Sequence, residues 1–144
     1  MSRRREERGS AVVEFVALGV LLLVPLVYLV MTLARVQAGA YAVSAAAREA
    51  GRAYVTSPSA GAAGARAERA ARLAFEDQGF GGVGALSVRC DATPCLRPGA
   101  RVETVASVRV PLPLVPAFAR GAVPLEVPLQ SSHLSLVDRF RASP

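Results

Sequence analysis

The chain has 144 residues, a hydrophobic fraction of 52% and a formal net charge of +6, which leaves room for one domain or for a membrane anchor with one small domain. All 17 basic residues are Arg, and the chain contains no Trp and a single His. Because no basic helical face interleaved with aromatic side chains is present, this charge does not indicate nucleic-acid binding.

The first predicted element is a membrane-spanning helix over residues 10–34. Residues 15–34 contain no charged side chain, and a helix of that length measures about 30 Å, the thickness of the hydrocarbon core. Arg outnumbers the acidic residues before this run, so the N-terminus is expected in the cytoplasm and the chain after Ala34 outside. A mild kink is expected at Pro25, which transmembrane helices tolerate.

A secretory signal is the alternative interpretation of the same segment. Ala38-Gly39-Ala40 has the small-x-small form of a signal-peptidase site, and cleavage there would release a chain beginning at Tyr41. The apolar region of such signals is about 7–15 residues long, shorter than the run here, and Arg35 separates that run from the site. The membrane anchor is therefore favoured.

Glu14 places a carboxylate at the cytoplasmic entrance to this apolar helix. Its side chain could simply snorkel to the headgroups at moderate cost. An ionisable residue inside a membrane is, however, by default a functional residue with a partner.

Two segments carry a resemblance to a known family. Arg8–Phe15, with the sequence RGSAVVEF, resembles the cleavage region of type IV prepilins, in particular the TadE-like pseudopilins of tight-adherence (Flp) pilus systems. Ala45–Tyr54, AAAREAGRAY, resembles the block that closes the TadE-like segment, so the similarity covers residues 8–56. Major Flp pilins usually have Glu-Tyr where this chain has Glu14-Phe15, and they are much shorter, which implies a minor subunit.

The resemblance implies processing followed by assembly. A prepilin peptidase would cut between Gly9 and Ser10, which makes residues 1–9 a leader and leaves Glu14 and Phe15 near the mature N-terminus. In type IV pilins this Glu faces the freed N-terminal amine of a neighbouring subunit, and opposite charges attract strongly in a low dielectric. The implied partners are the membrane, the peptidase, other pilin subunits and the assembly platform; no cofactor is implied.

The helix is expected to continue outside the membrane over residues 35–56, because this segment is rich in Ala and the next Pro is Pro58. Small residues recur there at three- and four-residue steps, namely Val36, Ala40, Val43, Ala47 and Ala50. Such a stripe lets another element approach closely. It would pack either on the helices of other subunits or on the protein's own head.

The remaining sequence predicts a small head over residues 65–144, joined by a linker over residues 57–64. A second helix is predicted over Ala65–Gln78, with Gly79 as its C-terminal cap. Alternation with a period of two then predicts strands over Ala85–Cys90, Arg101–Val110 and residues 123–136, in an antiparallel sheet of three or four strands. Residues 111–118 would form an extended, Pro-rich connection, and Pro124 and Pro128 confine the last strand to a sheet edge.

The fold class expected is therefore α+β, with a long N-terminal transmembrane and stalk helix followed by a small antiparallel β-sheet head that has one covering helix. Cys90 and Cys95 bracket a turn-forming tetrapeptide, and in an extracytoplasmic head they are expected to form a disulfide. A metal site would need more ligands than these and His133. Three serines lie near His133, but no nucleophile elbow accompanies them, so neither catalysis nor a small-molecule substrate is expected.

Taken together, the residues and the resemblance predict a single-pass protein of the cytoplasmic membrane that acts as a TadE-like pseudopilin, and no enzyme. The main alternative is a signal-anchored or secreted extracytoplasmic binding domain whose sheet face holds a ligand. A weaker alternative is a DNA-uptake or envelope accessory protein that uses the excess of Arg.

Overall fold

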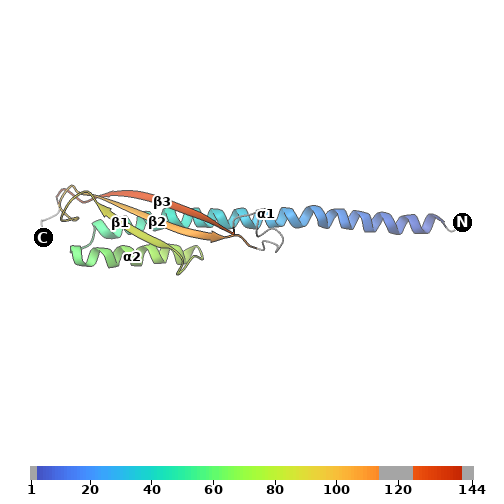
Figure 1. Cartoon of the computed structure of the whole chain (residues 1–144), viewed down its shortest axis with the longest axis horizontal. Coiled ribbons are helices and arrows are strands. Elements are labelled where there is room, and N and C mark those ends of the chain that lie inside the picture. Colours follow the sequence, from blue (N-terminus) through green and yellow to red (C-terminus); the bar gives the residue numbers. More distant parts are fainter. Residues whose placement is uncertain (1–2, 114–124, 141–144) are drawn as a thin grey trace. The chain divides into compact units, whose positions relative to one another are not determined.

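The computed structural model describes residues 3–113 and 125–140, with side chains from residue 11 onward. The chain divides into two compact units, residues 1–34 and 35–144. Its elements, labelled in Figure 1, are α1 (Arg3–Val55), α2 (Ala60–Asp77), β1 (Ala85–Cys90), β2 (Arg101–Pro111) and β3 (Glu126–Leu136). The α+β class is confirmed: the chain has a long apolar N-terminal helix, a small antiparallel sheet and a second helix.

The first unit is the N-terminal part of α1. All side chains from residue 11 to residue 27 are exposed, although nearly all of them are apolar, and the helix is continuous through Pro25. Among the described residues, one helical segment, Ala11–Val55, is long and apolar enough to cross a membrane. A membrane anchor and a signal sequence both have this length and composition.

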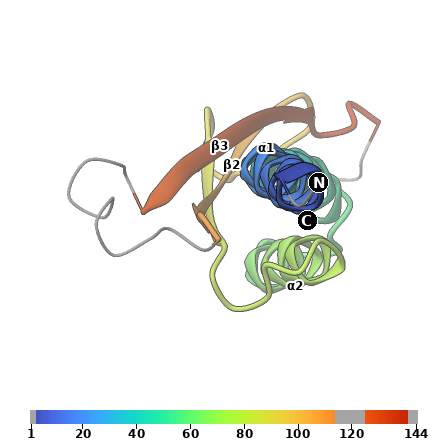
Figure 2. The same cartoon turned by 90° about the vertical axis from the view of Figure 1, so that its right-hand side faces the viewer.

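The second unit is built on an antiparallel sheet with the strand order β1-β2-β3. On β2, side chains that are buried alternate with side chains that are not, as predicted for this strand; the buried ones are Val102, Thr104, Ala106, Val108 and Val110. The C-terminal part of α1 packs on this face of the sheet, and α2 lies beside it (Figure 2). β3 is an edge strand, as Pro128 predicted, because Pro has no N–H for the ladder.

The C-terminal part of α1 forms the core of the head. Val43, Ala47 and Ala50 are buried against the protein's own α2 and sheet, whereas Ala40 is exposed. Two partners were considered for the small-residue stripe, the helices of other subunits and the protein's own head. For the C-terminal half of the stripe, the structure shows that the partner is the protein's own head. Residues 35–55 belong to the same compact unit as the sheet.

Glycine brings α1 unusually close to the sheet. A Cβ at Gly39 would lie 2.5 Å from Val110 Cγ2 and 2.9 Å from Leu129 Cδ1, and a Cβ at Gly51 would collide with the Ser135 hydroxyl. These distances leave no room for a Cβ, so the main chain of the helix lies directly against side chains of the strands.

The link between the helices is shorter than the predicted linker, because α2 begins at Ala60 and not at Ala65. The Ser59 hydroxyl accepts a hydrogen bond from the N–H of Ala62, and the Ala-rich segment that follows favours helix. At the other end Gly79 has a φ of +74°, and its N–H and that of Phe80 donate to the carbonyls of Glu76 and Phe75. This is the glycine cap that was predicted.

Two predictions fall partly outside the described residues. Of the extended connection predicted over residues 111–118, the structure describes only residues 111–113. Val123 and Pro124 of the predicted third strand also lie outside the described residues. Within the described residues, β2 extends to Pro111, and the N–H of Leu112 donates to the carbonyl of Leu125 at 2.9 Å. The pairing of β2 and β3 therefore continues just beyond both strands.

Candidate functional site

The predicted processing and assembly residues all lie in the first unit. Gly9 and Ser10 lie within helix α1. Glu14 and Phe15 follow within the next two turns of the same helix, and their side chains are exposed. No hydrogen bond or ion pair joins Glu14 to another of the side chains described. A charge partner for this carboxylate would therefore have to come from the undescribed N-terminal side chains or from another molecule.

The predicted disulfide between Cys90 and Cys95 is confirmed. It closes the turn that follows β1 and lies at the edge of a second small core formed by Ala63, Leu96, Ala100, Val102 and Val137. The Tyr54 hydroxyl lies 3.8 Å from Cys90 Sγ and must be the donor, since a disulfide sulfur carries no proton. The bridge thus lies next to the end of α1.

His133 and the neighbouring serines belong to β3. His133 pairs with Thr104 across the strands, and its main-chain carbonyl lies 3.1 Å from the Thr104 hydroxyl. In residues 3–113 and 125–140, no group of three or more His, Cys, Asp or Glu side chains is placed to hold a metal ion. Ser135 and His133 lie against Gly51 of α1, whereas Ser132 is exposed, and no hydrogen bond among the described residues joins the His133 side chain to a serine hydroxyl.

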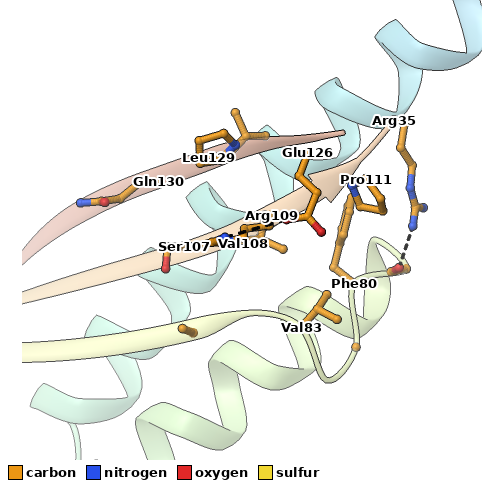
Figure 3. A pocket seen from close by; sticks show the side chains of 14 residues that line it. Arg35, Phe80, Val83, Ser107, Val108, Arg109, Pro111, Glu126, Leu129 and Gln130 are labelled. Atoms are coloured by element: carbon orange, nitrogen blue, oxygen red, sulfur yellow. Dashed lines mark hydrogen bonds and ion pairs between the residues drawn. The ribbon is translucent and has the colours of Figure 1, made fainter. Parts of the chain in front are cut away.

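A groove in the second unit, of about 790 Å³, was not anticipated from the sequence (Figure 3). Its walls come from the start of the head part of α1, from the turn over residues 79–84, and from all three strands. Phe80 forms part of its lining and is only 2% exposed. The lining is mixed, with apolar Val83, Pro111 and Leu129 beside charged Arg35, Arg109 and Glu126.

Two arginines give the groove its charge. The guanidinium of Arg35 lies 4.4 Å from the centroid of the Phe80 ring and donates to the carbonyl of Gly79 at 3.3 Å (Figure 3). Arg109 pairs with Glu126 at 4.0 Å, but their side chains are 80% and 51% exposed, so the pair contributes little to stability. Arg35 is left without an acidic neighbour among the lining residues.

Comparisons with known protein families, with curated proteins and with solved structures find no match for this chain. Function is therefore inferred from the chain's own residues and their arrangement.

The described residues include two regions with different chemistry, one in each unit. Glu14 and Phe15 mark the apolar helix of the first unit, whereas Arg35 and Phe80 mark one end of the head. Each region places a charged side chain beside exposed or aromatic apolar ones. A signal for the second region existed in the sequence: Arg35 is the first charged residue after the apolar run, and Phe80 stands in a Gly-rich turn.

Proposed function

We propose that the protein is a TadE-like pseudopilin, a minor subunit that a prepilin peptidase processes after Gly9 and that assembles into, or primes, a tight-adherence pilus or a related secretion apparatus. The observation that carries this proposal is the double role of α1. Its N-terminal part exposes apolar side chains with Glu14 as the only charge between residues 11 and 34. Its C-terminal part is the core of the head.

A helix of this kind serves both storage and assembly. In the membrane, the exposed apolar side chains are solvated by lipid. In an assembly, the same side chains pack against the helices of other subunits. Glu14 would pair with the N-terminal amine of a neighbour, and because an unpaired charge in this setting is costly, the pair would favour one axial register.

The released-domain alternative is less compatible with the packing of the head. Cleavage after Ala40 would remove Arg35, which covers the Phe80 ring, and Gly39, which lies against Val110 and Leu129. The mature chain would thus lose part of the helix that forms its own core. A signal-anchored binding domain that keeps all of α1 does not have this defect and remains the competing interpretation.

The mature N-terminus distinguishes these functions, and mass spectrometry of the protein from its native membranes measures it. A chain that begins at Ser10 is the expected result. A start at Met1 or Ser2 would indicate a plain signal anchor, and a start at Tyr41 a secreted domain; either result would overturn the proposal. Gly9→Leu should block processing, whereas the matched change Gly19→Leu, at a helical glycine with nothing within 4 Å of the added Cβ, should leave it intact.

A further inference from the structure

We propose that one end of the head rests on the bilayer and contacts anionic phospholipid headgroups. This base surface is formed by Arg35, the turn Gly79–Gly84, Arg109, Pro111, Leu112 and Leu125. The proposal depends on the membrane-spanning part of the proposed function and is independent of pilus assembly.

The depth of Arg35 relative to the bilayer follows from the sequence. Arg35 comes directly after Ala34, the last residue of the charge-free run. If residues 15–34 cross the hydrocarbon core as proposed, the main chain of Arg35 lies at its boundary, where headgroups begin. An Arg at this position would ordinarily extend its side chain freely among the headgroups.

In this protein the side chain of Arg35 is held by the head. Its guanidinium lies over Phe80 at 4.4 Å and donates to the Gly79 carbonyl at 3.3 Å. The turn that carries these two groups therefore lies within one side-chain length of the headgroup level. This conclusion follows from contacts within the head and from the covalent link to Ala34.

The composition of the base surface fits a lipid surface. The turn from Gly79 to Gly84 contains no charged residue, and Val83 within it is 60% exposed. Leu125, whose carbonyl accepts from the N–H of Leu112, is 49% exposed. Exposed apolar side chains with Arg around them are typical of segments that lie in the membrane interface.

The charge of the same surface favours an anionic lipid over a zwitterionic one. Arg35 and Arg109 both line the groove, and the one acidic side chain among the lining residues is Glu126. Glu126 pairs with Arg109, and Glu76 of α2 lies on the other side of the turn, against Gly81. Among the described residues, Arg35 is therefore the lining charge beside Phe80 that has no acidic partner. The complementary lipid is one whose headgroup carries a phosphate without a choline to neutralise it.

The absence of Trp from the chain permits a direct test with single introduced tryptophans. Three full-length variants are compared in nanodiscs made from equal parts of phosphatidylglycerol and phosphatidylcholine with brominated acyl chains: Leu22→Trp, Val83→Trp and Leu136→Trp. Val83 and Leu136 are matched apolar positions, 60% and 63% exposed, but Leu136 lies at the far end of β3 from Glu126. Bromine quenches Trp fluorescence only at short range.

We expect loss of fluorescence at Leu22→Trp and at Val83→Trp, and none at Leu136→Trp. Quenching at Leu22→Trp without quenching at Val83→Trp would overturn the base surface and leave the membrane span intact. If Leu22→Trp is not quenched, the membrane span itself fails, and the present inference with it.

The role of charge is tested in the Val83→Trp background. Quenching should fall when phosphatidylglycerol is replaced by phosphatidylcholine, and also in Arg35→Gln and Arg109→Gln. Arg109 is highly exposed, so its substitution separates loss of charge from loss of folding. The control is Arg48→Gln, which removes an exposed Arg of α1 whose side chain bonds Ser44 among the described residues and which should leave quenching unchanged. Equal quenching in both lipids would overturn the preference for an anionic headgroup.

Discussion

The hydroxyl of Thr104 on β2 donates a 2.7 Å hydrogen bond to the main-chain carbonyl of Ala47, in the part of α1 that belongs to the head. Both residues are fully buried. One turn further along the helix, a Cβ at Gly51 would lie 3.0 Å from the same hydroxyl. Helix and sheet are thus joined by a buried polar contact at a point where the main chain of the helix lies against side chains of the sheet.

Thr104→Val should lower the free energy of unfolding by about 1 kcal/mol, the usual net contribution of one buried hydrogen bond. Urea unfolding of the full chain in detergent, followed by circular dichroism of the head, measures this change. Thr56→Val is the matched control, since the Thr56 hydroxyl also bonds a helix carbonyl, that of Arg52 at 2.8 Å, but is exposed. Equal losses in both variants would contradict a special role for the buried contact.

Gly51→Ala should destabilise the head by about 1–3 kcal/mol, because the added methyl group has no room between α1 and the sheet. Intrinsic helix propensity alone predicts the opposite, a gain of up to about 1 kcal/mol. Gly64→Ala in α2, where nothing lies within 4 Å of the added Cβ, should show that gain in the same unfolding measurement. A gain in both variants would mean that α1 does not approach the sheet this closely.

Reduction of the Cys90–Cys95 disulfide should lower the free energy of unfolding by about 2 kcal/mol, as expected for so short a loop. The comparison is between the oxidised protein and the double variant Cys90→Ala/Cys95→Ala. A reductant should destabilise the former and leave the latter unchanged. Free thiols in protein isolated from its native membranes, detected by non-reducing mass spectrometry, would show that the bridge is not formed in the cell.

If the protein is the proposed pseudopilin, Glu14→Ala should leave membrane insertion intact and abolish recovery of the protein in complexes with pilin subunits. The physical reason is that the N-terminal amine of the neighbouring subunit would lose its counter-charge inside the membrane. Co-purification from crosslinked native membranes measures assembly, and fractionation measures insertion. Glu49→Ala, at an exposed Glu of the same helix, is the control, and unchanged co-purification of Glu14→Ala would refute the pairing.

Periodicity in the sequence was sufficient to predict most of the head. β1 was predicted at the residues where it is found, and the alternation in β2 identified the buried face, because a two-residue period leaves few other arrangements. The start of α2 was missed because Gly61 and Gly64 suggested a linker. The Ser59 cap and the surrounding alanines outweighed these two glycines.

The position of residues 35–55 in the core could not be settled from the sequence. A stripe of small residues is equally suited to a neighbouring helix and to a sheet, so the pattern did not identify its partner. The contact of Arg35 with Gly79 and Phe80 joins residues 44 positions apart, and no local pattern encodes such a pairing.

The packing of Leu129 against Gly39 also has a consequence for the time at which the head can fold. The core surface of α1 lies early in the chain, while β2 and β3, which cover it, are synthesised much later. Contacts between such distant segments require the closure of long loops and form slowly. The helix must therefore leave the ribosome with this surface still uncovered, and the head can close only after β3 has followed it.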